Sequence, residues 1–378
     1  MEDPAQMNRR PPEQGDSAVP DPALQTTAGP PPVTDTPAGG RPPDAASPSA
    51  AAPQLRRRSA TASNMSASSW AACYGAMATV RAVAALSFLL VPVQVAKRVY
   101  GAAAEPVDAQ HSQMLHLNAG AMLVGAAAAA AVALSGRSGG GLGARNTDLL
   151  KLAMAGQGLA VTLCVIYYCR TITRSLLPLE LATAALLAAL PAADLVTGGR
   201  RRGLLDELSS RLCAASRTSP LALALYGLAW LFPLVGLLLA YFPHFAMFHL
   251  FGYAYGSSTF LLARVAGVAD KSLIPVALLV LKDATESGAL RTRAAKVLSA
   301  GLMLAGVVHM RVLLPLLAKG RGGWVLPIAA STWVAAFLAA TVALLAGLET
   351  RGSTTGPAGG GMAGRGGAGD EVVGEKKD

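Results

Sequence analysis

The chain has 378 residues, of which 52% are hydrophobic and only 14% are charged, and its formal net charge is +10. This charged fraction is about half that of soluble domains, which argues against a soluble enzyme. With only four cysteines and no Gly-X-Y period, disulfide-rich secreted and collagen-like proteins are excluded. A multi-pass membrane protein with polar tails remains.

The first polar tail is expected over residues 1–67, which are rich in Pro, Ala, Ser and Thr and too poor in large apolar side chains to fold. Its acidic beginning argues against a secretory signal peptide. Three arginines at positions 56–58 are expected to anchor the chain at the membrane surface. The alternative is a phosphorylation switch at Ser59, because added negative charge would weaken attraction to anionic lipid. A Gly-rich flexible tail is expected over residues 349–378.

Between the tails, apolar runs alternate with polar loops, and each run is close to the length that crosses a bilayer. This pattern predicts an all-α membrane protein with eight transmembrane helices. The second run contains six consecutive alanines, Ala126 to Ala131, which are small and only weakly lipophilic, so that helix is expected to pack against other helices. The expected spans are 74–96, 114–134, 150–170, 175–196, 221–242, 258–281, 295–317 and 324–347.

The two halves of this region repeat the same residues in the same order, which predicts two tandem four-helix repeats over 70–197 and 220–348, joined by a basic linker over 198–219. The matches pair Tyr74-Gly75 with Tyr226-Gly227, Pro92 and Gly101 with Pro243 and Gly252, Ala119-Gly120 with Ala266-Gly267, Ala155-Gly156 with Ala300-Gly301, and Leu177-Pro178 with Leu326-Pro327. In its Pro, Gly and Ala-Gly motifs, the unit resembles small DoxX-like four-helix membrane proteins, and these motifs carry over no activity and no site residue.

An even number of spans in each repeat relates the halves by a pseudo-two-fold axis along the membrane normal and puts both termini on one side. Arg and Lys are concentrated in the N-terminal tail and the 2–3, 4–5 and 6–7 loops. The positive-inside rule therefore places both termini in the cytoplasm or its stromal or matrix equivalent, in a membrane that the sequence does not identify. The positive charge is explained by topology, and no basic patch interleaved with aromatic residues predicts nucleic-acid binding.

The sixth span contains three charged residues, Arg264, Asp270 and Lys271. Asp270 is expected near the midplane of the membrane, where a carboxyl group needs a proton or a cationic partner. Arg264 and Lys271 are seven residues apart and share a different face, so His309 or Arg311 of the seventh span is the expected partner. These five residues form the predicted substrate or ion site; the alternative is a buried structural ion network.

Other polar residues in the first half are assigned structural roles. Asn118 and Gln157 are expected to make interhelical hydrogen bonds. Arg81 is expected to extend toward its own end of the first span. Glu180 and Asp194 lie near the ends of the fourth span and are expected to be hydrated.

No catalytic motif of the Gly-x-Ser-x-Gly, His-Glu-x-x-His or Cys-x-x-Cys type is present. Four histidines lie near the 1–2 and 5–6 loops as two pairs, His111 with His116 and His244 with His249, and the two members of each pair are five residues apart. This is not the spacing of a metal site. The aromatic residues around His244 and His249 indicate a belt at the membrane interface. We therefore expect no enzyme activity, no cofactor and no metal.

These features predict an integral multi-pass membrane protein that transports or conducts a small solute or a proton through a site near Asp270. The alternative is a non-catalytic membrane scaffold or assembly factor that acts through protein partners of the N-terminal tail. The lipid bilayer is the expected environment in either case.

Overall fold

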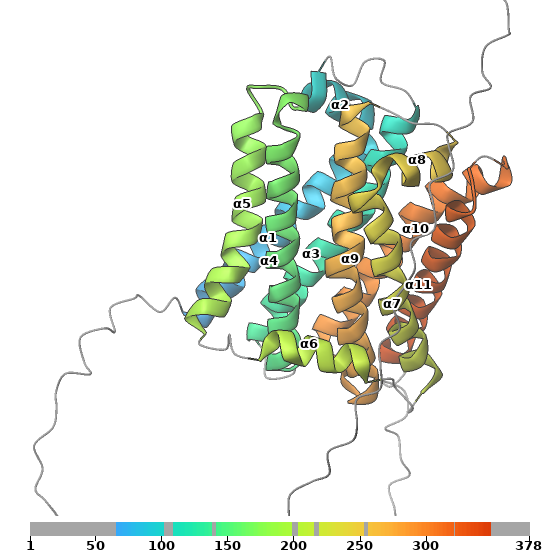
Figure 1. The fold of residues 1–378 in the computed structure, drawn as a ribbon. Coiled ribbons are helices and arrows are strands. Elements are labelled where there is room, and N and C mark those ends of the chain that lie inside the picture. Colours follow the sequence, from blue (N-terminus) through green and yellow to red (C-terminus); the bar gives the residue numbers. More distant parts are fainter. Residues whose placement is uncertain are drawn as a thin grey trace, which may run out of the picture. The chain divides into compact units, whose positions relative to one another are not determined.

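A computed structural model of the chain describes residues 66–101, 109–137, 141–198, 203–214, 219–252, 256–320 and 322–348. All regular structure in these ranges is helical, which confirms the all-α prediction (Figure 1). The C-terminal tail, Ser59 and all but the last two residues of the N-terminal tail fall outside the described ranges.

Each of the eight predicted apolar runs overlaps a long helix, with limits that differ by several residues for some of them. Seven of these helices, among the described residues, are long and apolar enough to cross a membrane, as expected of a multi-pass integral membrane protein. Helix α9 is also long, but it carries too many charged side chains, Asp270 among them, to be counted as apolar enough to cross a membrane. The long helices are α1 (Ala67–Leu90), α3 (Ala109–Arg137), α4 (Ala144–Tyr167), α5 (Leu177–Thr197), α7 (Pro220–Tyr241), α9 (Ser257–Glu286), α10 (Arg293–Ala318) and α11 (Val325–Leu348).

The first span differs from its predicted limits of 74–96, because Pro92 breaks the run. The residue before a proline is pushed out of the helical conformation, and Val91 has φ −134° and ψ 48°. Helix α1 therefore ends at Leu90 and a short helix, α2 (Pro92–Tyr100), follows. The same break at Pro243 separates α7 from α8 (Pro243–Phe251). Shorter elements are α6 (Leu204–Cys213) in the predicted linker and the 3-10 turns η3 (Cys169–Thr171) and η4 (Ala289–Arg291).

The long helices pack in pairs around two enclosed helices, α3 and α9. Helix α1 packs on α3, α7 on α9, α4 on α5, and α10 on α11 (Figure 1). Helices α3 and α9 contact each other, and each also contacts a helix from the other half of the chain: α3 meets α10, and α9 meets α4. The core is therefore formed where α3 and α9 meet.

Small side chains bring these helices close together. The alanines at positions 126–129 and 131 are buried, as predicted for the second span. A Cβ atom on Gly301 of α10 would meet the Ala127 side chain of α3. A Cβ atom on Gly236 of α7 would lie 2.7 Å from the carbonyl oxygen of Gly267 on α9, so these two backbones touch.

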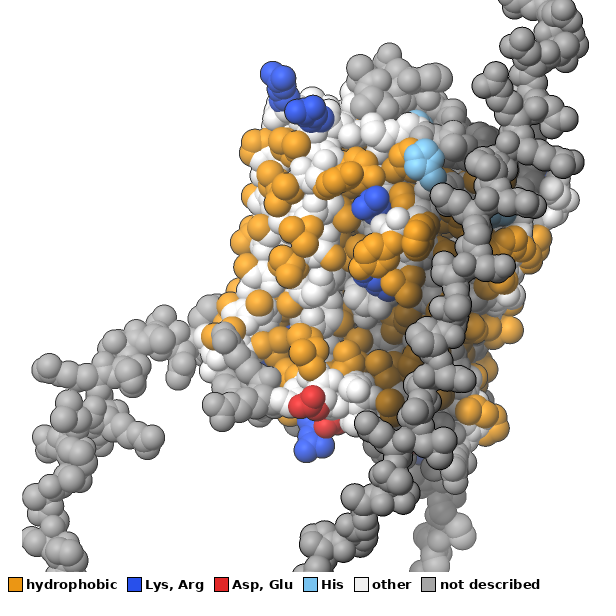
Figure 2. All heavy atoms as spheres, viewed as in Figure 1, with side chains coloured by type: hydrophobic (Ala, Val, Ile, Leu, Met, Phe, Trp, Pro, Cys, Tyr) orange, Lys and Arg blue, Asp and Glu red, His pale blue; other side chains and the backbone are white. Residues whose placement is uncertain are grey.

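The outer surface of the helices is largely apolar. Figure 2 shows hydrophobic side chains over most of the visible face between its two ends. A soluble protein rarely exposes so large an apolar area, whereas a lipid-facing surface requires it. Exposed examples are Val83, Leu163, Leu186, Leu234 and Leu338.

Helix α6 lies across one end of the long helices, opposite α2 and α8 (Figure 1). The Tyr226 hydroxyl donates a hydrogen bond of 2.6 Å to the carbonyl oxygen of Leu212 at the end of α6. The Arg211 guanidinium contacts the side chain of Asn146, in the first turn of α4, and the side chain of Asp283, near the end of α9. Helix α6 is thus bonded to both halves of the chain.

Candidate functional site

Asp270 lies halfway along α9, and its side chain is buried. Only 3% of the residue is exposed. Its Oδ1 atom has no hydrogen-bond partner among the described residues, and no described cation forms an ion pair with it. Helices α7 and α9 are in close contact at Gly236 and Gly267, and this contact places the backbone of Asp270 next to α7. An isolated carboxyl group in such surroundings is expensive to keep ionised, so it is suited to binding a proton.

His309 projects from α10 into the same region and is 4% exposed. Its Nδ1 atom donates a hydrogen bond of 2.8 Å to the carbonyl oxygen of Ala305, so Nε2 is left as the proton-accepting nitrogen of a neutral ring. The imidazole stacks on Trp333 of α11, with ring centroids 3.6 Å apart. On the α3 side, a Cβ atom on Gly120 would collide with the imidazole, so this glycine provides the space for the ring.

Asp270 and His309 line one small cavity of about 20 Å³. The other residues that line it are all apolar, Leu117, Leu239, Leu313 and Trp333 among them, so the two titratable groups face apolar surroundings. A space of this size holds one water molecule. No hydrogen bond joins Asp270 to His309 among the described residues, so this arrangement can pass a proton between the carboxyl and imidazole groups only through such a water, and it has no room for a larger solute.

The structure brings Asp270 and His309 together but places the other three predicted site residues outside this cavity. The Arg264 guanidinium lies over the rings of Tyr167 and Tyr168, 5.5 and 5.6 Å from their centroids. Lys271 donates a hydrogen bond of 2.8 Å to the Tyr241 hydroxyl. Arg311 is exposed on α10. Figure 2 shows basic side chains within the apolar face, away from both ends.

Arg81 of α1 corrects the sequence-based expectation, because it does not extend toward the end of its helix. It is 2% exposed and turns inward, where Nη1 donates a hydrogen bond of 2.9 Å to Oε1 of Gln157 on α4. Asn118 of α3 lies nearby and donates to the carbonyl oxygen of Leu262 on α9 at 3.0 Å. The interhelical hydrogen bonds predicted for Asn118 and Gln157 are therefore confirmed.

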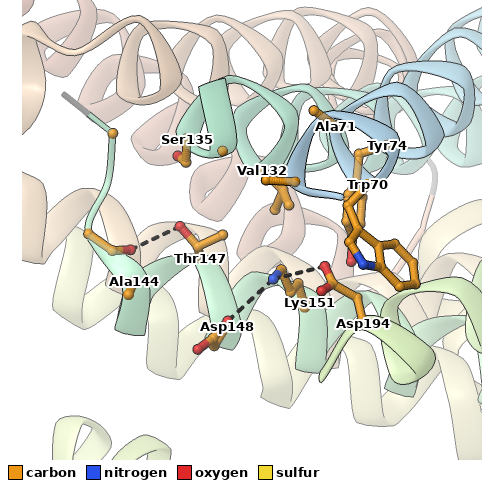
Figure 3. Close-up of a pocket in the computed structure, with 14 residues that line it drawn as sticks. Trp70, Ala71, Tyr74, Val132, Ser135, Ala144, Thr147, Asp148, Lys151 and Asp194 are labelled. Atoms are coloured by element: carbon orange, nitrogen blue, oxygen red, sulfur yellow. Dashed lines mark hydrogen bonds and ion pairs between the residues drawn. The ribbon is translucent and has the colours of Figure 1, made fainter. Parts of the chain in front are cut away.

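A wider pocket lies between the ends of α1, α3, α4 and α5 (Figure 3). Its volume is about 420 Å³, and Trp70 and Tyr74 of α1 form one wall. Across from them, Lys151 pairs with Asp194 at 2.8 Å and with Asp148 at 3.4 Å. These three side chains are mostly buried but border the open pocket, so the triad is a fixed, charged lining with two acids and one base.

Sequence reasoning missed this triad. Asp194 was expected to be hydrated near the end of its span, but it is buried in an ion pair. A signal was available, because Lys151 lies inside an apolar run and Asp148 precedes it by one helical turn. What the sequence does not reveal is that α5 presents Asp194 to the same place. Glu180, the other acid of this helix, is half-buried in its first turn.

The histidines predicted not to bind metal lie among aromatic and hydroxyl groups. His111 Nε2 is 3.0 Å from the hydroxyl of Ser258. His249 contacts the rings of Phe245, Phe248 and Trp324, and these exposed aromatic residues lie beside α8 as expected for an interfacial belt. Among the described residues, no group of three or more His, Cys, Asp and Glu side chains is placed to hold a metal ion.

No protein-family model matches the chain, and no curated protein matches it either.

Proposed function

We propose that α9 is an eighth membrane span. Its 30 residues are long enough to cross the bilayer, and it packs along α7, which is a candidate span throughout its length. Its charged residues do not require an aqueous surface. Asp270 is enclosed within the helices, and Arg264 and Lys271 are each stacked on tyrosine rings.

The eight spans form two tandem repeats in this proposal, and the packing supports it. The pairs α1–α3 and α4–α5 of the first half correspond to α7–α9 and α10–α11 of the second. The repeat would turn the contact of α3 with α10 into a contact of α9 with α4, and that contact is also present. The short helices α2 and α8 also correspond, since each begins with proline and is followed by a glycine with positive φ.

One pair of backbone hydrogen bonds supports the repeat at the level of single residues. Thr173 N donates to the carbonyl oxygen of Val99 at 2.7 Å, and Gly323 N donates to the carbonyl oxygen of His249 at 2.6 Å. Gly323 follows Thr173 by the same number of residues as His249 follows Val99. A pseudo-two-fold axis along the membrane normal would pass between α3 and α9, with both termini on the α6 side.

The function that we propose is proton movement across the membrane through Asp270 and His309. The observation that carries it is an unpartnered, buried carboxyl group, halfway along α9, that shares a one-water cavity with an imidazole. Both groups exchange protons, and a histidine held at Nδ1 by a carbonyl keeps Nε2 available. The small cavity favours a proton over a larger solute.

The test is proton flux in vesicles that contain the purified protein and a trapped pH-sensitive dye, driven by a potassium diffusion potential. Asp270→Asn keeps the volume but removes the titrating group, so flux should fall to that of protein-free vesicles. The matched control is Glu180→Gln, a half-buried acid outside the cavity, which should retain wild-type flux. Equal flux in wild type and Asp270→Asn, or no flux in wild type above protein-free vesicles, would contradict the proposal.

The second candidate function is membrane scaffolding, and a separate observation favours it. Arg264 and Lys271 form no ion pair among the described residues, and both lie on the outer side of α9 near the exposed Tyr167 and Tyr241. Two unpaired cations at membrane depth fit a partner helix that carries a carboxyl group. A fluorescent transmembrane peptide with one central Asp should then bind in vesicles, its Asn counterpart should not, and Arg264→Gln with Lys271→Gln should abolish the difference.

A further inference from the structure

The first half of the protein contains a buried positive charge that no acid neutralises. Arg81 is 2% exposed, while Asp148 of α4 and Asp194 of α5 pair with Lys151. No described carboxylate forms an ion pair with Arg81. Burial of an uncompensated guanidinium is costly, because the charge loses its hydration without gaining a counter-ion.

The surrounding helices hold this charge in place. Nη1 donates to the amide oxygen of Gln157, while Nε is buried and has no hydrogen-bond partner among the described residues. A Cβ atom on Gly125 of α3 would collide with the guanidinium, so Gly125 leaves the space that the group occupies. The arginine is therefore seated in a fitted site, with only one of its five N–H groups in a hydrogen bond to a described residue.

A cavity of about 20 Å³ adjoins the guanidinium. Arg81, Asn118 and Gln157 supply its polar lining, and Ala121, Val161 and Val265 are among the apolar residues that close it. It has room for one particle of about the size of a water molecule. A cation with a free donor beside a space of this size has the features of a site for a small anion.

We propose that this cavity binds a single monovalent anion of halide size, with the Arg81 guanidinium as its counter-ion. The guanidinium donates to the anion, and Gln157 holds the guanidinium in position. Asn118 closes the site from α3 and is fixed there by its hydrogen bond to α9. This site is separate from the Asp270–His309 cavity and does not depend on proton movement.

The rival occupant is a water molecule. Asn118 Oδ1 is buried without a hydrogen-bond partner, so one water could accept from Arg81 Nε and donate to this oxygen. The two occupants are distinguished by charge. If the cavity holds water, the stability of the protein does not depend on the halide concentration. If it holds an anion, both the stability and the amount of anion bound increase with the anion concentration by mass action.

The experiment measures radioactive chloride binding by equilibrium dialysis and thermal unfolding of the purified protein in detergent. Sodium chloride is titrated against sodium gluconate at constant ionic strength, because gluconate is too large for the cavity. Wild type should bind about one chloride per chain and unfold at a higher temperature as chloride rises. Arg81→Met should weaken chloride binding at least about thirtyfold, the effect of removing one partner of a buried hydrogen-bonded charge pair.

The matched control is Arg311→Met, which removes an exposed arginine of α10 outside this cavity and should retain chloride binding. If Arg81→Met does not fold, Gln157→Leu decides, because it keeps the charge but frees the guanidinium and should weaken binding. Absence of saturable chloride binding in wild type, or the same chloride affinity in wild type and these variants, would overturn the proposal and assign the cavity to water.

Discussion

Buried charged residues of this protein fall into two groups, according to whether an opposite charge lies beside them. Lys151 has two carboxylate partners, at 2.8 and 3.4 Å. Asp270 and Arg81 have none among the described residues. A paired charge stabilises the fold as long as all its partners remain, whereas an unpaired charge at membrane depth is a cost that function has to explain. We therefore expect different effects when the two groups are replaced.

Lys151→Met should destabilise the protein, because it leaves Asp148 and Asp194 close together without a cation. The expected loss is about 2 to 3 kcal/mol in the free energy of unfolding, at the low end for a buried pair because the triad borders an open pocket. Chemical unfolding in detergent measures it. The control is Lys296→Met on α10, since Lys296 forms no ion pair among the described residues. Equal losses in the two variants would contradict a specific role for the triad.

Gly120→Ala should displace His309, because the added methyl group would collide with the imidazole. Overpacking of this kind costs about 1 to 3 kcal/mol. The stacking of His309 on Trp333 should also change, which tryptophan fluorescence can follow. Gly75→Ala is the control, since a Cβ atom there would meet nothing within 4 Å. It should be neutral or stabilise by up to about 1 kcal/mol through the better helix propensity of alanine.

The sequence predicts that Asp270 lies near His309 or Arg311, because these residues interrupt long apolar runs and few partners are available to an acid in such a run; the structure places His309, and not Arg311, at the cavity that Asp270 lines. It does not predict the inward turn of Arg81. A long arginine side chain reaches either the end of its helix or a neighbouring helix, and the choice depends on the space left at Gly125. The contact between Lys151 and Asp194 depends in the same way on how α4 and α5 are packed.

At the scale of helices, small residues decide which faces meet. A Cβ atom on Gly267 would lie 2.6 Å from the backbone nitrogen of Ala240 and 2.7 Å from the carbonyl oxygen of Gly236. Backbone atoms cannot rotate away as a flexible side chain does. The close packing of α7 on α9 therefore requires glycine at both positions.

Gly267→Ala should accordingly separate α7 from α9 and lower the free energy of unfolding by about 1 to 3 kcal/mol, the cost of overpacking. Proton flux should fall as well, since the same packing positions Asp270. Gly227→Ala on α7 is the control, because a Cβ atom there would meet nothing within 4 Å. Thermal unfolding and flux of the two variants should differ; unchanged values in Gly267→Ala would show that the helices tolerate a wider spacing.

Most helix limits are predictable from apolar runs, but two features are not. The chain breaks at Pro92 within an apolar run, so run length alone extends the first span too far. Helix α6 lies in a basic linker without an apolar run, and its contacts with Tyr226, Asn146 and Asp283 come from distant parts of the chain.

On the scale of the whole helical region, α6 links the two halves through one side chain. Arg211 contacts Asn146 in the first turn of α4 and Asp283 on α9, as well as Glu207 within α6. Arg211→Gln should weaken these contacts by about 1.5 to 3 kcal/mol, the usual value for hydrogen bonds to charged groups. Amide hydrogen exchange in α6 should then be faster, while exchange in α3 should not change.

The control for this prediction is Arg145→Gln, because Arg145 is largely exposed and lies 3.8 Å from Glu207. An exposed ion pair of this kind contributes little, so exchange in α6 should stay close to that of wild type. Faster exchange in both variants would mean that α6 is held by general surface charge and not by Arg211.

The attachment of α6 also defines how the halves can move. Because α6 holds the two halves together at one end, they can separate only by rotating about that end. The displacement of one half from the other then increases with distance from α6. The largest opening would therefore occur at the far end, between α2 and α8, while the α6 end stays closed. A rotation of one half against the other would then have its fixed point at α6, and severing α6 would remove that point but leave the contacts of α3 with α9 and α10 and of α4 with α9.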